Sequence, residues 1–470
     1  MLSKSISKVF STNLKQIIVL VMLFSLFVLS INVVWYTGYT SPLIGLSESL
    51  CNLSIYLDPG LKNEVDVIEI NGRYLFAGQP GLSMLLAIPL CLFRSVVANK
   101  LFLGGIVLSF ITVFAIYTSY RITCLYNLNR FGLFSSVAIA LAGPLWVYST
   151  HLFPQAALAL SLGLMMYSLL IIVRNSNVNP LWLILAGFSS GFSILLDPSM
   201  ISSLLIIDLV VLIYLIQKVR RKSLNLITLI KYIILYIVGF SPLIIVLLIY
   251  NTLATGNPFI FTEQYFLSKK SIELYGFTTP FYLGLYIQLL DLRKGLLPLY
   301  PVMIIALMSL PLFLKELCKN LIEKLILLNI LIVPALTYSM WYDPDGGLSY
   351  GPRFLVPLTI FLSPTLAYIL EKHYRLRIVF ALLMGYCIIE NIIVTTTTPY
   401  PCAYEDLEPL ENQFISCCIP HLLKGTRSSY LYQSVKNLVS EPYSTILTMV
   451  IKALFALVIV IIAIMASNKS

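Results

Sequence analysis

Residues 342–358 read YDPDGGLSYGPRFLVPL and lie between two apolar stretches, one that ends near Trp341 and one that starts at Phe354. The segment gathers two carboxylates, three glycines and an arginine where the sequence on either side is almost wholly apolar. Ionisable side chains are costly inside hydrocarbon, so we expect such a segment at a membrane surface. It therefore predicts a fold with several membrane spans and a polar site at one face of it.

The rest of the chain has the composition of an integral membrane protein. Of its 470 residues, 59% are hydrophobic and 11% are charged, and the mean hydropathy is +0.90. Apolar runs of about 17 to 25 residues, long enough to cross the hydrocarbon as helices, recur along the whole sequence. We expect one integral membrane domain over 1–470, an all-α bundle of about twelve transmembrane helices. The predicted spans are 15–37, 99–120, 131–149, 155–173, 181–196, 200–217, 232–250, 296–314, 322–341, 354–370, 378–395 and 445–466.

The basic residues predict the orientation of this bundle. If the N-terminus is cytoplasmic, more than half of the 31 Lys and Arg fall in short inner loops, and most of the 21 Asp and Glu fall outside. Lys and Arg accumulate in cytoplasmic loops, so both termini are predicted in the cytoplasm of a plasma-membrane protein. The net charge of +10 then reflects topology and not nucleic-acid binding. The first apolar run follows three lysines, lacks a small-residue cleavage site and is interpreted as a retained signal anchor.

The larger connections are all predicted on the extracytoplasmic side, at 38–79, 251–295, 342–353 and 396–444. In the first, Leu43, Leu46, Leu50 and Leu53 have helical spacing and predict an interfacial helix that lies on the membrane. The apolar run after Gln79 is short for a span and predicts a re-entrant or juxtamembrane helix. The role of 396–444 stays open.

The cysteines and histidines do not form a recognisable metal motif. The eight cysteines include no CxxC pair and the three histidines are far apart, which argues against a zinc site. Cys402, Cys417 and Cys418 share an outer loop, where a disulfide and free thiols are both open.

Three cations stand where predicted helices begin at the outer face. Arg353 opens one helix, and a helix N-terminus with an Arg fork suits a phosphate. Arg293 and Lys294 come just before another helix, so the three side chains can grip one lipid-linked phosphate or pyrophosphate. The alternatives are an arginine that snorkels to the interface and loose charges near lipid headgroups.

Carboxylates in the outer loops are candidates for proton transfer and metal binding. Glu48, Asp58 and Asp66 lie in the first loop, where a carboxylate can act as general base for an acceptor hydroxyl. Asp343 and Asp345 have a spacing that can share a divalent cation near a phosphate. For both groups, solvated loop acids are the alternative. Outer turns also carry His151 and Gln155, in STHLFPQ at 149–155, and Asp197, in LLDPSM at 195–200, and these side chains can line a cavity that opens outward.

Taken in order, these segments resemble a known family. NGRYLFAGQPGLSMLLAIP, LWVYSTHLFPQAALAL, YNTLATGNPFIFTEQY, RKGLLPLYPVMIIAL and GGLSYGPRFLVPL are similar in order to motifs of the integral membrane glycosyltransferases of the GT-C superfamily. The branch they resemble contains protein mannosyltransferases and aminoarabinose transferases. The resemblance runs from about residue 15 to 370 and is strongest in the Gly-Gly-x-Ser-x-Gly-Pro-Arg stretch.

The resemblance implies a polyprenyl-phosphate sugar donor and a catalytic acid in the first outer loop. By position this acid is Asp66, with Tyr74 in the same pattern and expected to line the cavity, while Asp58 and Glu48 remain rivals because the family acid often follows the first span closely. Gly351 and Arg353 match the family's Gly-Pro-Arg. The acid would deprotonate the acceptor, a lipid, glycan or protein, while the cations stabilise the departing phosphate, with inversion at the sugar carbon.

A transporter or flippase of lipid-linked sugars or other anions is the alternative function. It would use ionisable residues within the predicted spans, namely Asp208, Glu390 and Lys452. The sequence has no internal repeat of fixed period, and its candidate residues gather on the outer side. Both observations favour the enzyme.

Overall fold

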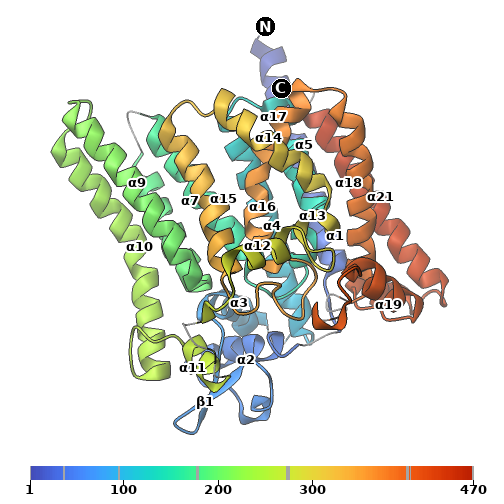
Figure 1. The fold of residues 1–470 in the computed structure, drawn as a ribbon. Helices are drawn as coiled ribbons and strands as arrows, with labels where there is room; N and C mark the ends of the chain where they lie inside the picture. Colours follow the sequence, from blue (N-terminus) through green and yellow to red (C-terminus); the bar gives the residue numbers. More distant parts are fainter. Residues whose placement is uncertain are drawn as a thin grey trace.

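The computed structural model describes residues 2–34, 37–93, 96–175, 179–270, 272, 276–398, 402 and 404–467. Within these residues the fold is a bundle of helices, and the regular strands form one two-stranded hairpin (Figure 1). The all-α polytopic fold predicted from the apolar runs is therefore confirmed.

Eight helical segments of the described chain are long and apolar enough to cross a membrane. They are α4 (Lys100–Leu125), α7 (Gln155–Arg174), η2 with α9 (Pro198–Met200 and Ile201–Arg220), α10 (Leu226–Thr255), α15 (Leu321–Ser339), the run Arg353–Lys372, α18 (Leu376–Thr396) and α21 (Tyr443–Ser467). The run Arg353–Lys372 is built from η4 (Arg353–Leu355), α16 (Val356–Thr359), η5 (Ile360–Leu362) and α17 (Ser363–Lys372).

The other four predicted spans coincide with helices whose apolar part is shorter or interrupted. These are α1 (Leu2–Ser30, apolar over Leu14–Ser30), α5 with α6 (Asn129–Leu141 and Leu145–Tyr148), α8 (Pro180–Leu196) and α13 with α14 (Leu296–Leu299 and Val302–Glu316). Pro144 and Pro301 stand at the two interruptions, where a residue without an N–H cannot continue the hydrogen-bond ladder.

The end of the bundle opposite both termini carries short elements that we call the site face (Figure 1). Here α2 (Thr40–Cys51), η1 (Pro59–Leu61), strands β1 (Val67–Ile70) and β2 (Arg73–Phe76), and α3 (Pro80–Phe93) occupy the first large connection. The second large connection forms α11 (Thr262–Lys269) and α12 (Phe281–Leu289). The last contains η6 (Tyr404–Asp406), the π-helical turn η7 (Phe414–Cys418), α19 (Ile419–Leu423) and α20 (Tyr430–Val435).

The predicted interfacial helix exists as α2, but two of its four predicted leucines turn inward. Leu43 and Leu46 are fully buried and α2 packs against α3, so these two belong to the protein core. Leu50 is partly buried, and Leu53 lies beyond the helix and is 98% exposed. Cys51 at the end of α2 is joined to Cys91 of α3 by a disulfide that the sequence did not predict. The short apolar run after Gln79 is helical, as expected, and forms α3.

The most deeply buried helices lie in the middle of the bundle. In the run Arg353–Lys372, 94% of the most apolar stretch is buried inside the protein, and in α7 83%, whereas in α10 only 17% is buried. The loop before Arg353 therefore leads into a central helix and not a peripheral one.

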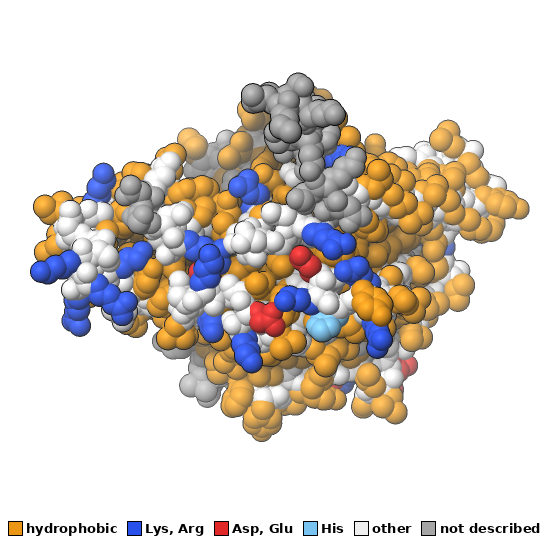
Figure 2. Space-filling view, turned by 90° about the horizontal axis from the view of Figure 1, so that it is seen from above, with side chains coloured by type: hydrophobic (Ala, Val, Ile, Leu, Met, Phe, Trp, Pro, Cys, Tyr) orange, Lys and Arg blue, Asp and Glu red, His pale blue; other side chains and the backbone are white. Residues whose placement is uncertain are grey.

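The face that carries the termini is rich in basic side chains. Figure 2 shows Lys and Arg spread over this face, with few Asp and Glu among them. This distribution is the one that the loop charges predicted for a cytoplasmic face.

Candidate functional site

Asp66 stands at the open end of the β1–β2 hairpin. The strands pair from Val67↔Phe76 to Ile70↔Arg73, and Asn71 and Gly72 make the turn with φ of 53° and 73°. Two positive φ values define the type I′ turn that Asn-Gly favours and that matches strand twist. The Ala77 N–H donates to the Asp66 carbonyl at 2.9 Å and extends the ladder by one pair. The hairpin thereby fixes the Asp66 backbone.

Arg353 lies at the start of the central helix run, as predicted, and its guanidinium is held by aromatic rings. Its Cζ lies 5.4 Å from the centroid of Phe153 and 4.9 Å from that of Phe354. Among the described residues it makes no ion pair within 4.0 Å, and its buried Nε finds no hydrogen-bond partner. Its guanidinium does interact electrostatically with Asp343 and Asp66. The cation is thus positioned without being neutralised by direct contact.

A cavity of about 250 Å³ opens beside Arg353. Its walls combine one cation, two carboxylates and a set of aromatic rings. The residues that line it are Asp197, Pro198, Ser199, Ile201, Phe261, Glu263, Gln264, Leu267, Phe277, Thr337, Tyr338, Trp341, Arg353 and Phe354. Aromatic faces suit the apolar faces of a sugar ring, and polar groups at fixed positions suit its hydroxyls. The cavity has the chemistry of a small-molecule site.

The two carboxylates of the cavity have different surroundings. Asp197 accepts hydrogen bonds from the Ser199 N–H at 3.0 Å, the Ser199 hydroxyl at 2.6 Å and the Tyr338 hydroxyl at 2.6 Å. Burial raises the pKa of Asp197, and these bonds oppose the rise. Burial raises the pKa of Glu263 to about 7, and the Asp197 carboxylate adds to it. Of these two carboxylates, Glu263 is therefore the one whose pKa burial brings to about 7.

Asp66 belongs to the same electrostatic cluster. Burial raises its pKa, while the Arg353 guanidinium and Lys270 lower it. The helix that carries Glu263, α11, packs against β1, and Asp66 also influences the pKa of Glu263. The fold thus brings the first outer loop, α11 and the central helix together, as the pairing of Asp66 with Arg353 required.

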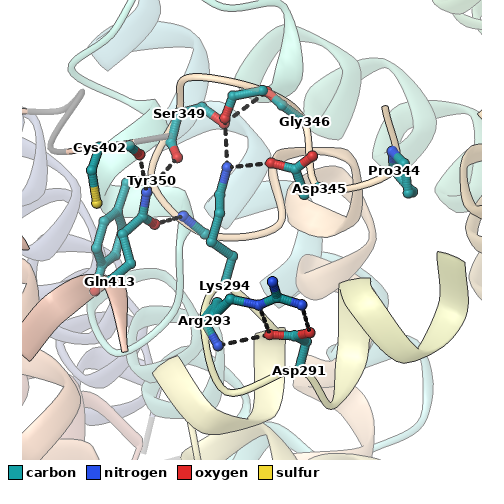
Figure 3. Close-up of polar contacts among 12 residues, drawn as sticks. Asp291, Arg293, Lys294, Pro344, Asp345, Gly346, Ser349, Tyr350, Cys402 and Gln413 are labelled. Atoms are coloured by element: carbon teal, nitrogen blue, oxygen red, sulfur yellow. Dashed lines mark hydrogen bonds and ion pairs between the residues drawn. The ribbon is translucent and has the colours of Figure 1, made fainter. Parts of the chain in front are cut away.

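The predicted metal pair is engaged by a lysine. Lys294 has a fully buried side chain whose Nζ donates to Asp345 Oδ2 at 2.8 Å and to the Gly347 carbonyl at 2.5 Å (Figure 3). Burial lowers the pKa of Lys294, and Asp345 opposes this. Burial and then Asp345 raise the pKa of Asp343. The described residues contain no group of three or more His, Cys, Asp or Glu that could hold a metal, so a divalent cation here stays a prediction.

The remaining predicted phosphate ligands lie close to this pair. Arg293 forms a two-pronged ion pair with Asp291, with Nε to Oδ1 at 3.0 Å and Nη2 to Oδ2 at 2.8 Å (Figure 3). Gly351 has φ of 63°, and its N–H donates to Gln413 Oε1 at 2.9 Å. A left-handed φ is where glycine is favoured over other residues. Lys294 and Arg353 also interact electrostatically, so the two helix starts that carry them lie near each other.

Several predicted residues lie away from the cavity wall. His151 is buried, its Nδ1 lies 2.8 Å from the Thr150 hydroxyl, and burial lowers its pKa to about 4. Gln155 is buried at the start of α7, and Tyr74 lies in β2 against the core. Of the four residues predicted to line a cavity, Asp197 alone lines this one.

The rivals of Asp66 lie in another part of the first loop. Glu48 forms an ion pair with Lys100 at 2.5 Å, and Asp58 caps η1 by accepting from the Gly60 N–H at 2.7 Å. Both line a separate hollow of about 550 Å³ between α2 and η1. Asp66 is among the groups with the largest electrostatic influence on Arg353, and Glu48 and Asp58 are not.

The ionisable residues of the spans are bonded within the bundle. Asp208 accepts from the Tyr236 hydroxyl at 2.9 Å, Glu390 from the Tyr350 hydroxyl, and Lys452 donates to the Thr395 carbonyl at 3.0 Å. None of the three lines the cavity beside Arg353.

Sequence reasoning missed Glu263, the cavity aromatics and Gln413. Glu263 lies in the stretch YNTLATGNPFIFTEQY, which was used only for its order among the motifs. The hairpin had a local signal that was overlooked, since Asn71-Gly72 between alternating residues is a strong indicator of a type I′ turn. Gln413 had no local signal, because its role depends on contacts with residues more than 60 positions away.

Comparisons with known proteins give a match by structure and not by sequence. No protein-family model matches the sequence, and no curated protein matches it significantly. ArnT from Cupriavidus metallidurans bound to undecaprenyl phosphate is similar with a TM-score of 0.54 and 12% identity, over 97% of this chain and 76% of ArnT. The apo state of the same ArnT gives a TM-score of 0.51 and 11% identity, over 98% and 77%.

An archaeal oligosaccharyltransferase, AglB from Archaeoglobus fulgidus, gives a TM-score of 0.47 and 13% identity, over 98% of this chain and 56% of AglB. ArnT, an aminoarabinose transferase, and AglB are members of the GT-C superfamily. The ArnT similarity extends over nearly the whole chain and agrees with the resemblance in motif order. The chain therefore shares the fold of ArnT.

Proposed function

We propose that this protein is a glycosyltransferase that moves a sugar from a polyprenyl-phosphate carrier to an acceptor at the extracytoplasmic face. The observation that carries the proposal is Arg353 in the cavity wall. Two aromatic rings hold its guanidinium, and no described carboxylate pairs with it directly. A cation kept in this state is suited to an anionic ligand, and a planar guanidinium binds phosphate with two parallel hydrogen bonds.

A lipid carrier fits this position better than a water-soluble donor. Arg353 begins the central helix run, so its cavity lies where the helix bundle meets the site face. A carrier phosphate can reach the guanidinium there while its isoprenoid chain stays in the membrane. The similar ArnT structure was solved with undecaprenyl phosphate, a carrier of this chemical class.

One of the carboxylates near Arg353 is proposed to accept the proton of the acceptor. Asp66 is the leading candidate for the base that deprotonates the acceptor hydroxyl or amine, and Glu263 is a second candidate because it lines the cavity. The nucleophile attacks the anomeric carbon as the bond to the phosphate oxygen breaks, and Arg353 stabilises the negative charge that the phosphate gains. Direct displacement inverts the configuration at that carbon.

Two independent features support the extracytoplasmic placement. The disulfides Cys51–Cys91 and Cys402–Cys417 both belong to elements of the site face, and disulfides persist in oxidising compartments. The opposite face, with both termini, carries the basic side chains seen in Figure 2.

The test uses purified protein in lipid vesicles with radiolabelled polyprenyl-phosphate hexoses and pentoses and an envelope extract as the source of acceptors. We expect Arg353→Ala to lower transfer by about 100- to 1000-fold, as for other groups that stabilise transition-state charge. Arg121→Ala is the matched control, because Arg121 also lies near two rings, those of Tyr117 and Tyr167. Assays with EDTA and with added Mg²⁺ test the predicted cation at Asp343 and Asp345.

A binding experiment keeps the test independent of the acceptor. Wild-type protein should bind polyprenyl phosphate in preference to polyprenol, and Arg353→Ala should lose the preference. The proposal fails if the wild type shows neither transfer nor this preference, or if Arg353→Ala keeps both. Movement of labelled carrier across the vesicle membrane without transfer, abolished by changes at Asp208, Glu390 or Lys452, would favour the transporter instead.

A further inference from the structure

The loop 343–352 is held by side chains from distant elements as well as by its own backbone. Gly346, Gly347 and Gly351 all have positive φ, which places the loop outside helix and sheet geometry. Within the loop, the Gly346 N–H donates to the Asp343 carbonyl and the Ser349 N–H to the Gly347 carbonyl, and four carbonyls accept hydrogen bonds from side chains of distant elements. These bonds are Gln288 Nε2 to Pro344 at 3.1 Å, Lys294 Nζ to Gly347 at 2.5 Å, Gln413 Nε2 to Ser349 at 3.0 Å and the Tyr148 hydroxyl to Tyr350 at 3.0 Å.

Gln413 is the member of this set that contacts the loop on both sides of Tyr350. Its Nε2 donates to the Ser349 carbonyl at 3.0 Å and to the Cys402 carbonyl at 3.0 Å, and its Oε1 accepts from the Gly351 N–H at 2.9 Å (Figure 3). The side chain is fully buried, so all three bonds form away from water. A carboxamide is suited to this position because it offers donors and an acceptor in one plane.

The backbone around Gln413 also holds the second cationic segment. The Gln413 N–H donates to the Arg293 carbonyl at 2.9 Å, and Asn412 Nδ2 donates to the Leu292 carbonyl at 3.0 Å. One residue thus touches both the segment that carries Lys294 and the loop that leads to Arg353. The 396–444 connection, which the sequence left without a role, supplies this residue.

We propose that Gln413 is a positioning residue that keeps Arg353 in place for the donor phosphate and holds the neighbouring segment that carries the Lys294–Asp345 ion pair. The expected effect of Gln413 on donor kinetics rests on the proposed function, whereas its expected effect on the loop does not. Arg353 follows Gly351 by two residues, and the Arg353 N–H donates to the Gly351 carbonyl at 3.0 Å. A shift of Gly351 is therefore passed directly to the arginine.

A covalent link holds the segment that presents Gln413. Cys402 and Cys417 are joined by a disulfide, and Gln413 lies between them in the sequence. The disulfide closes a loop of the chain from Cys402 to Cys417. Gln413 Nε2 also donates to the Cys402 carbonyl, so its side chain forms a second link within this closed loop. The segment can therefore hold the loop as a preformed unit.

The first arm of the test measures the loop without using activity. Hydrogen exchange of the amides in 346–355 is followed in wild type, Gln413→Ala and the control Gln433→Ala. Gln433 is a suitable control because its Nε2 donates to the Arg427 carbonyl at 3.1 Å, within the same C-terminal region. Loss of buried hydrogen bonds should speed exchange about tenfold or more in Gln413→Ala and leave Gln433→Ala unchanged.

The second arm measures donor kinetics. We expect Gln413→Ala to raise the KM for polyprenyl-phosphate sugar about tenfold or more and to lower kcat, because the cations are displaced in both the ground state and the transition state. Gln413→Glu keeps the acceptor for the Gly351 N–H but turns a carboxylate toward two carbonyls. Protonation restores one donor, so the activity of Gln413→Glu relative to wild type should rise from pH 7.5 to 5.5, whereas that of Gln413→Ala should not.

The inference is overturned if Gln413→Ala exchanges its loop amides at the wild-type rate, whatever the activity. It is also overturned if exchange accelerates but donor KM and kcat equal those of Gln433→Ala. If wild type transfers no sugar while the loop loosens as expected, the proposed function fails and the structural role of Gln413 stands without its catalytic consequence.

Discussion

The hairpin that carries Asp66 and the loop that carries Arg353 interact electrostatically, but their backbones are held in different ways. In the hairpin, β1 and β2 satisfy each other from Val67↔Phe76 to Ile70↔Arg73, around a two-residue turn. In the loop 343–352, four carbonyls accept hydrogen bonds from the side chains of residues 148, 288, 294 and 413. The base candidate thus lies beside a strand ladder formed by neighbouring residues, whereas the loop that leads to Arg353 is held by side chains from distant parts of the fold.

This difference has a consequence for mutation. A change in the hairpin should act locally, because the pairs between β1 and β2 join residues no more than nine positions apart. A change in any of the distant side chains that serve the loop should reach Arg353. The following predictions test this contrast, from the largest expected effect to the smallest.

The buried ion pair under the loop should be the most sensitive point. Lys294→Met removes the partner of Asp345 and the donor to Gly347, and we expect it to destabilise the protein by about 3–5 kcal/mol, since it leaves a buried carboxylate unpaired. Thermal and denaturant unfolding in detergent measure the change. The control Lys100→Met breaks the half-exposed pair with Glu48 and should cost about 0–1 kcal/mol. Equal costs for the two variants would contradict the contrast.

Removal of the Cys51–Cys91 disulfide should have the second largest effect on stability. Cys51→Ala with Cys91→Ala should cost about 2–4 kcal/mol, because it opens a closed loop that contains the hairpin. Hydrogen exchange of 67–76 should still show protected strand amides, because these bonds are local. Cys124→Ala, at a free cysteine, is the control and should cost less. If the amides of β1 and β2 exchange rapidly once the disulfide is removed, the strand pairing depends on the disulfide, which contradicts this contrast.

Two glycines with similar backbone angles allow a matched comparison. Gly72→Ala and Gly351→Ala each place a Cβ at positive φ, at 73° and 63°, at a cost of about 1–2 kcal/mol. A Cβ at Gly72 meets nothing within 4 Å, whereas one at Gly351 lies 3.3 Å from Leu299 Cδ1. We expect donor binding to fall more in Gly351→Ala, measured with labelled polyprenyl phosphate. A larger loss in Gly72→Ala would reverse the comparison.

The pH dependence of Glu263 should give the smallest effect. Burial raises its pKa to about 7, so the folded protein binds more protons than the unfolded chain between the ordinary Glu range and neutral pH. The stabilisation that this proton provides is complete below the unfolded pKa and is lost as pH rises through 7. Glu263→Gln should therefore gain about 1 kcal/mol relative to wild type between pH 6 and pH 8, followed by thermal unfolding. If the difference in stability between Glu263→Gln and wild type is constant with pH, the pKa of Glu263 is not raised in the folded protein.

Much of the fold followed from the sequence for a simple reason. Apolar runs of membrane length must form helices, because hydrocarbon offers no partners for backbone groups. The spans and the helix start at Arg353 were therefore predictable, and Pro144 and Pro301 explain where two spans are interrupted. The helix α2 was also predicted, but not the side to which its leucines turn, because lipid and protein core are both apolar.

The candidate site was predictable only in part. Arg353 and Asp66 could be singled out because each belongs to a motif with a recognisable order along the chain. Glu263 could not, because a glutamate in an outer loop looks like any solvated acid until α11 packs against β1. The Cys51–Cys91 pair was hidden for the same reason, since 40 residues separate the two cysteines.

The sequence by itself determined the membrane class, the hairpin turn at Asn71-Gly72 and the presence of an arginine at the start of the central helix. These features depend on hydrophobicity, on local backbone preference and on neighbouring residues. Tertiary structure alone decided that Lys294 binds Asp345, that Glu263 joins Asp197 at the cavity and that Gln413 holds Gly351. Each of these contacts joins side chains from distant segments, and only the packed helices bring their atoms within hydrogen-bond or electrostatic range.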